Sequence, residues 1–273
     1  MGIQRILNLM TNPANTIWCH ADSKTTRTEE GSILSPYRTL EGAVAALTSA
    51  RPNILVMPGE YTIEETLALP TTHGCSITAV GGEVEINAAV TVTPLISIAP
   101  AATGGTAVYR TNGLYIANVE TSQLGVQIDN ADAEHKTLWI LNDCHIEKDS
   151  GTAIDVDHDG VPTVRIYANR CEIEGSINFD VGNPQDRFWA TNCEIMGLLT
   201  SKGDNTLCEF RYMNCLVKAT ACAVNSGLTT QCFMSLGTKS VIVTDDELTA
   251  RTYAALVSAD IGTAGDFTET IVD

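Results

Sequence analysis

The feature that most constrains the fold is a short repeat in the middle of the chain. An apolar residue, a variable residue and a second apolar residue recur at steps of 22–30 residues. This alternation has the period of two that is typical of a β-strand. A unit of this size cannot bury an apolar face alone, so it must stack on copies of itself. The units are Tyr61-Thr62-Ile63, Val84-Glu85-Ile86, Leu114-Tyr115-Ile116, Cys144-His145-Ile146, Cys171-Glu172-Ile173, Cys193-Glu194-Ile195 and Cys215-Leu216-Val217.

Each repeat also carries two further alternating segments. One follows the unit, as in Val126-Gln127-Ile128, and one precedes the next unit, as in Val164-Arg165-Ile166. Gly, Asn, Asp and Ser gather between the segments, as turns require. Three short strands per repeat predict an all-β fold, a single-stranded right-handed parallel β-helix of about eight coils between Ile54 and Ile242. Leucine-rich repeats have a similar period, but their leucine ladder and helical half are missing here.

Stacked coils place like residues on like. Cysteine opens four successive units, and we expect it to form a buried column. The nine cysteines are odd in number and form no Cys-x-x-Cys pair, which favours reduced thiols packed as small hydrophobes. Asparagine precedes the units by one or two residues, and we expect it at a corner, where it tolerates left-handed backbone geometry. These asparagines are Asn112, Asn142, Asn169, Asn192 and Asn214.

The ends of the chain differ from the middle. A helix is predicted after the N-cap Thr39, with Leu40, Val44 and Leu47 on one face. A second helix is predicted after Thr244, and each helix would close one open end of the β-helix. The expected parts are an N-terminal arm (1–16), an N-terminal cap with a helix (17–52), the parallel β-helix (53–243), and a C-terminal cap helix with an acidic tail (244–273).

The N-terminal part resembles a known family. Ile17-Trp18-Cys19-His20-Ala21-Asp22, Ser35-Pro36-Tyr37-Arg38-Thr39-Leu40 and Val56-Met57-Pro58-Gly59-Glu60-Tyr61 resemble the first segment of pectate-lyase-like β-helix proteins. The resemblance covers residues 17–63 by motif and 64–242 by repeat pattern. It implies the right-handed β-helix fold. It implies little about activity, because that fold carries lyases, hydrolases, phage tailspikes and inert spacers.

Charge excludes some partners. The chain has 33 acidic and 16 basic residues, a formal net charge of −17. Such a chain repels phosphate backbones and anionic lipid, so we expect no nucleic acid and no membrane partner. The segment Met1–Met10 lacks the apolar core of a secretion signal, and no apolar run is long enough to span a membrane.

Candidate chemical residues are acidic. Asp155-Val156-Asp157-His158-Asp159-Gly160 resembles the first half of an EF-hand loop, although Ile166 stands where the closing glutamate belongs. Asp155, Asp157 and Asp159 are therefore candidate Ca²⁺ ligands, and no other cofactor is expected; the alternative is a solvated acidic turn. If Asp132 lies one coil away, Asp132, Asp155 and Asp157 form a carboxylate cluster, and the candidates for it are a glycosidase pair, a cation site or plain surface. His145, Glu172 and Glu194 should stack outward on consecutive coils.

The three tryptophans are candidates for an interface or a ligand site. Trp139 and Trp189 belong to the strand that precedes a unit, and both are expected to point outward. There they would stack on sugar or pack against another subunit. Trp18 is expected in the N-terminal cap or arm.

We therefore expect a noncatalytic structural protein of a virus particle, most concretely a capsid decoration or head-surface protein of a bacteriophage. A phage protein reaches the outside by assembly and lysis, so it needs no secretion signal, and its location would be the virion. Its partners would be the major capsid protein, other virion proteins and further copies of itself, with a trimer expected. The alternatives are a glycan-binding tail or fibre protein, and a polysaccharide lyase or glycosidase.

Overall fold

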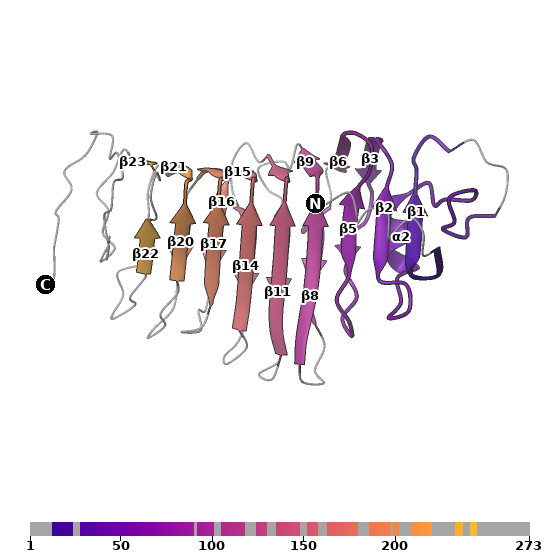
Figure 1. Cartoon of the computed structure of the whole chain (residues 1–273), viewed down its shortest axis with the longest axis horizontal. Coiled ribbons are helices and arrows are strands. Elements are labelled where there is room, and N and C mark those ends of the chain that lie inside the picture. Colours follow the sequence, from indigo (N-terminus) through magenta and orange to yellow (C-terminus); the bar gives the residue numbers. More distant parts are fainter. Residues whose placement is uncertain are drawn as a thin grey trace, which may run out of the picture.

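The structure is a computed structural model. It describes residues 13–23, 28–89, 92–100, 105–117, 124–129, 135–147, 152–157, 163–179, 186–197, 199–201, 209–219, 233–236 and 241–244. The fold is all-β: parallel strands wind into a right-handed β-helix, or β-solenoid, whose long strands lie side by side in Figure 1. Each full coil contributes three strands, one to each of three parallel sheets.

Sheet 1 has nine strands. In order these are β1 (Thr16–Cys19), β2 (Asn53–Val56), β5 (Ser76–Ala79), β8 (Gly105–Asn112), β11 (His135–Asn142), β14 (Thr163–Asn169), β17 (Arg187–Thr191), β20 (Glu209–Met213) and β22 (Phe233–Leu236). They are the upright arrows of Figure 1.

Sheet 2 has eight strands, which contain the repeated unit. They are β3 (Gly59–Ile63), β6 (Val84–Ala88), β9 (Leu114–Ala117), β12 (His145–Ile146), β15 (Glu172–Glu174), β18 (Glu194–Met196), β21 (Leu216–Ala219) and β23 (Val241–Thr244). Sheet 3 has six: β4 (Leu67–Ala68), β7 (Ile96–Ile98), β10 (Val126–Asp129), β13 (Thr152–Asp157), β16 (Ser176–Phe179) and β19 (Leu199–Ser201).

The core is a set of stacked apolar columns. Inward-pointing isoleucines of successive units lie in register along sheet 2 and are fully buried. They are Ile86, Ile116, Ile146, Ile173 and Ile195, and the buried Tyr61 takes the same position on β3, where Ile63 pairs with Ala88 instead. Alternate residues point outward, as the period of two requires. The unit is thus the sequence signature of one core column and one surface column.

The cysteine column is confirmed for the described residues. Cys144, Cys171, Cys193 and Cys215 form no disulfide and are nearly inaccessible to solvent. The Cys171 backbone N–H donates to Sγ of Cys193 at 3.4 Å. Burial of these small thiols in a stacked column is the packing that the repeat predicted.

The corner between sheets 1 and 2 is left-handed. Asp143, Arg170, Asn192 and Asn214 have φ between 53° and 56°. The asparagine prediction is therefore correct for Asn192 and Asn214. On the longer strands the asparagine ends the strand instead, and the following residue makes the turn. Side-chain amides bridge successive coils, as where Asn142 Nδ2 donates to Asn112 Oδ1 at 3.0 Å and Asn214 Nδ2 to Asn192 Oδ1 at 2.6 Å.

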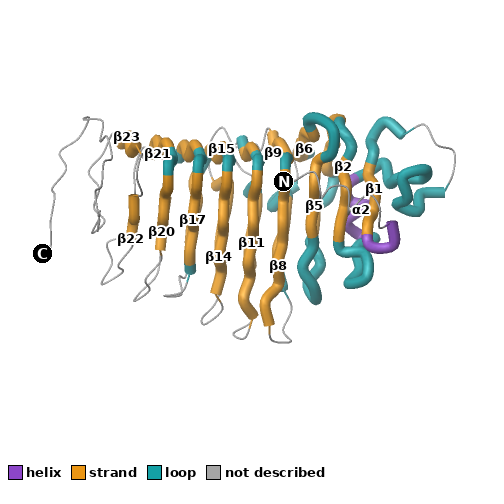
Figure 2. The backbone as a smooth tube through the Cα atoms, in the orientation of Figure 1, coloured by secondary structure: helices purple, strands orange, loops and turns teal. Residues whose placement is uncertain are grey.

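Helical structure is sparse (Figure 2): a short 3₁₀ helix, η1 (Pro13–Asn15), and one α-helix, α2 (Leu40–Ala45), among the described residues. Thr39 caps α2 as predicted, because its hydroxyl accepts from the Gly42 N–H at 3.2 Å. The helix packs on β1, β3 and β4 and is shorter than expected, since Leu47 lies beyond its end. No helix of the described part is long and apolar enough to cross a membrane.

Two predicted end segments lie outside the described residues. These are most of the N-terminal arm (1–12) and the C-terminal helix with its acidic tail (245–273).

Candidate functional site

Only part of the predicted carboxylate cluster lies among the residues that the structure describes. Asp155 and Asp157 lie on the outward side of β13, half-buried and exposed respectively. Register pairs Asp157 with Asp129 on β10, and Asp155 with Gln127. Asp132 and Asp159 lie outside the described residues, so the glycosidase pair and the Ca²⁺ loop stay predictions.

Two of the three tryptophans are not surface residues. Trp139 was expected to point outward, and this is wrong: its side chain is 0% exposed and its Nε1 donates to Thr111 Oγ1 at 3.0 Å. Leu138 and Ile140 take the outward positions instead. Trp18, on β1, is also buried, at 5% exposure. Because both rings are buried, neither Trp139 nor Trp18 can contact a ligand or a partner at the surface.

Trp189 does point outward. Its ring makes an edge contact with Tyr167 of the previous coil, with the ring centroids 5.0 Å apart. The guanidinium carbons of Arg211 and Arg187 lie over the ring, 4.6 and 5.3 Å from its centroid. Arg165 continues the Arg187 column on β14. We call these five residues, on the outer surface of sheet 1, the Arg–Trp face.

The Arg–Trp face contains a shallow depression. It is lined by Tyr167, Trp189, Arg211 and Met213, together with backbone and small residues of β14 and β17. Met213 is 49% exposed and adds apolar surface to the depression. Aromatic, methionine and arginine side chains together are the composition of a protein interface.

The outer surface of sheet 2 is acidic, whereas the Arg–Trp face on sheet 1 is basic. The register of sheet 2 places acidic residues, a tyrosine and a histidine in one column. The prediction that His145, Glu172 and Glu194 stack outward on consecutive coils is confirmed. The column runs Glu60, Glu85, Tyr115, His145, Glu172 and Glu194.

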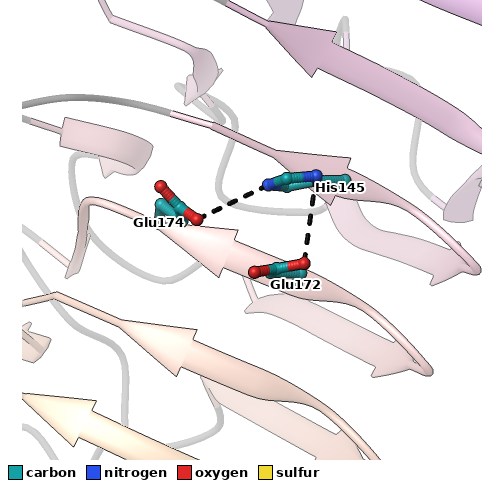
Figure 3. A group of neighbouring side chains, drawn as sticks. All are labelled: His145, Glu172 and Glu174. Carbon is teal, nitrogen blue, oxygen red and sulfur yellow. Dashed lines mark ion pairs between the residues drawn. The ribbon is translucent and has the colours of Figure 1, made fainter.

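Figure 3 shows how three side chains converge within this surface. His145 Nδ1 lies 3.9 Å from Glu172 Oε2, and His145 Nε2 lies 3.7 Å from Glu174 Oε1. Glu174 lies two residues after Glu172 on β15 and thus on the same side of the sheet. One ligand atom from each of the three residues lies within 4.8 Å of the others. His145 and Glu172 line an open depression of the surface, which Asp143, Arg170 and Glu194 also line.

The His145 ring is held from the preceding coil. The Tyr115 ring stacks on it with centroids 4.6 Å apart and an angle of 20° between planes. The Tyr115 hydroxyl donates to Glu147. That bond, together with burial and nearby glutamate charges, raises the pKa of Tyr115 to about 12. Tyr115 is therefore a neutral hydrogen-bond donor at physiological pH.

The surroundings of Glu174 disfavour the charged form of its carboxyl group. Burial raises the pKa of its carboxyl, and the negative charges of Glu172 and Glu147 raise it further, while His145 acts in the opposite direction. The single imidazole of His145 therefore faces two carboxyl groups, those of Glu172 and Glu174.

Sequence reasoning found His145 and Glu172 but missed Glu174, Tyr115 and Glu147. Tyr115 occupies the variable position of its own unit, so the repeat alignment already held the signal for its contact with His145. Glu147 and Glu174 lie one residue beyond their units, at the next outward position. Extending each three-residue unit by one more outward residue finds both glutamates.

Comparison with protein-family models, with curated proteins and with solved structures gives no match for this chain.

Proposed function

We propose that this chain is a noncatalytic structural protein of a virus particle, a capsid decoration or head-surface protein of a bacteriophage. The observation that supports this best is the unbroken stacking of apolar columns through the described coils. A parallel β-helix packed in this way is a stiff rod that holds its outer surfaces at fixed positions. Rigid display of surfaces is what a particle component requires.

The Arg–Trp face supports a role in assembly. Arginine and tryptophan dominate the binding energy of protein interfaces. Because the two guanidinium groups lie over the Trp189 ring, they obstruct the stacking of a sugar there, which favours a protein partner over a glycan. We propose a second copy of this chain as the occupant.

Charge complementarity points to a second copy. The chain carries a net charge of −17, yet the Arg–Trp face gathers three of its sixteen basic residues on three adjacent strands. Glu209, on β20, is the register partner of Arg187. Exposed acidic residues such as Glu60, Glu83 and Asp157 lie on or beside the other two sheets. A basic face on one copy meeting an acidic face on the next makes a heterologous contact that closes into a ring, and we propose a trimer.

Three finer features of the fold belong to the same proposal. We propose about eight coils, in keeping with the nine and eight strands of sheets 1 and 2. We propose that α2 and a C-terminal helix close the two ends. We also propose kinship with pectate-lyase-like β-helix proteins, on the motifs of residues 17–63.

Peptide mass spectrometry on gradient-purified particles from the source culture tests the function. Copy number is measured against the major shell protein. Hundreds of copies per particle are expected for a capsid decoration protein. A handful would replace the capsid role with a tail or fibre role. Absence of the chain from intact particles would contradict the proposal, and a panel of polysaccharide cleavage assays would then test the enzyme alternative.

A further inference from the structure

The group formed by His145, Glu172 and Glu174 has the donor set of a metal site. It offers one imidazole nitrogen and two carboxylates within 4.8 Å of one another. Two ligands that share a tetrahedral Zn²⁺ at about 2.1 Å lie about 3.4 Å apart. The separation of 3.7 Å between His145 Nε2 and Glu174 Oε1 is close to this value. A small movement of the side chains brings the two atoms onto one ion.

The same separation is too long for a hydrogen bond. His145 Nε2 is inaccessible to solvent and has no hydrogen-bond partner among the described residues. The His145 side chain is 32% exposed overall, yet this nitrogen lies in its covered part, and an unpaired polar atom in such a place needs an explanation, which a shared ion provides. This observation is independent of the acidic character of the surface.

The surroundings are those of a built metal site. Stacking on Tyr115 fixes the plane of the His145 ring. The Tyr115 hydroxyl in turn binds Glu147, one residue beyond β12 on the same surface. Outer groups that orient the ligands in this way raise metal affinity.

We propose that His145, Glu172 and Glu174 bind one divalent transition-metal ion, with water in the remaining coordination positions. An imidazole ligand suits Zn²⁺ and its neighbours in the first transition series, whereas Ca²⁺ and Mg²⁺ take oxygen ligands. The site is distinct from Asp155 and Asp157 of β13 on sheet 3 and from the Arg–Trp face on sheet 1. It does not depend on the proposed structural function.

Isothermal titration calorimetry of the chelator-stripped full chain with ZnCl₂, under reducing conditions at pH 7.5, tests the proposal. We expect one Zn²⁺ per chain that 1 mM CaCl₂ does not displace. His145→Ala and Glu174→Gln are each expected to weaken this binding at least tenfold. Glu174→Gln keeps the shape of the side chain, and its far-UV circular dichroism should match that of the wild type.

Glu194→Gln is the matched control. It removes one carboxylate charge from the outward column of Glu172, one coil away, and it should change Zn²⁺ affinity less than twofold. Three results would overturn the proposal. The first is no Zn²⁺ binding by the stripped wild type, which would leave the three side chains as a surface group without a metal. The second is equal weakening by Glu194→Gln and Glu174→Gln, which marks a diffuse acidic surface. The third is binding that survives His145→Ala, which places the ion on other residues.

Discussion

Replacing Trp139 by alanine tests which face of β11 points into the core. The ring is fully buried, in register with Tyr109 on one coil and Ile166 on the next. Truncating a buried tryptophan costs about 3–5 kcal/mol, because the transfer free energy is lost and a cavity remains. Loss of the bond from Nε1 to the Thr111 hydroxyl adds about 1 kcal/mol. The expected loss of unfolding free energy is thus about 4–6 kcal/mol.

Trp189→Ala is the matched control, because the same side chain is removed from the outer surface of sheet 1, two strands further along on β17. Only the contacts with Tyr167, Arg187 and Arg211 are lost, at about 0.5–1.5 kcal/mol for the aromatic pair and about 0.5–1 kcal/mol for each exposed cation–π contact. Urea unfolding followed by far-UV circular dichroism measures both variants. A loss for Trp139→Ala no greater than that for Trp189→Ala would refute the inward placement of Trp139.

Three further outcomes follow from the backbone and the thiols. Asn192→Ala should lower the unfolding free energy by about 1–2 kcal/mol, because alanine resists the left-handed corner; Asn192→Gly keeps the corner and should cost less, by the same urea assay. Gly74→Ala would put a Cβ 2.1 Å from a β8 carbonyl oxygen, so we expect a loss of about 1–3 kcal/mol and a lower melting temperature by calorimetry. Burial raises the pKa of the Cys19 and Cys75 thiols to about 12. At pH 8 both should resist iodoacetamide in the folded chain and react in urea, as read by peptide mass spectrometry; reaction in the native state would contradict their burial.

The period of the sequence was sufficient to predict the coil and its three strands, because burial imposes strict alternation on a stacked strand. It failed at Trp139 for a physical reason. Leu138, Trp139, Ile140 and Leu141 are all apolar, so alternation cannot tell the inner from the outer residues. The register with Arg165 on the next coil decides, since it places Leu138 in an outward column.

The candidate site also has a part that the sequence predicts and a part that it does not. His145 and Glu172 share one position of the repeat, and stacking alone predicts that they meet. The approach of Glu174 to the far side of the ring depends on rotamers, and so does the stacking of Tyr115. A pattern of residue types carries no information on rotamers. The segments between coils have no sequence period. The sequence therefore suggested a role for Asp132 but could not predict the position of its side chain.

Sedimentation equilibrium of the purified chain tests the central claim, that this rod assembles with copies of itself through the Arg–Trp face. At physiological salt the wild type is expected at three times the 29.2 kDa mass of one chain, and higher salt should weaken the assembly. Arg211→Glu should sediment as a single chain, whereas Arg38→Glu, the same charge reversal next to α2, should leave the trimer intact. A wild type of one-chain mass, or an Arg211→Glu variant as large as the wild type, would contradict the account.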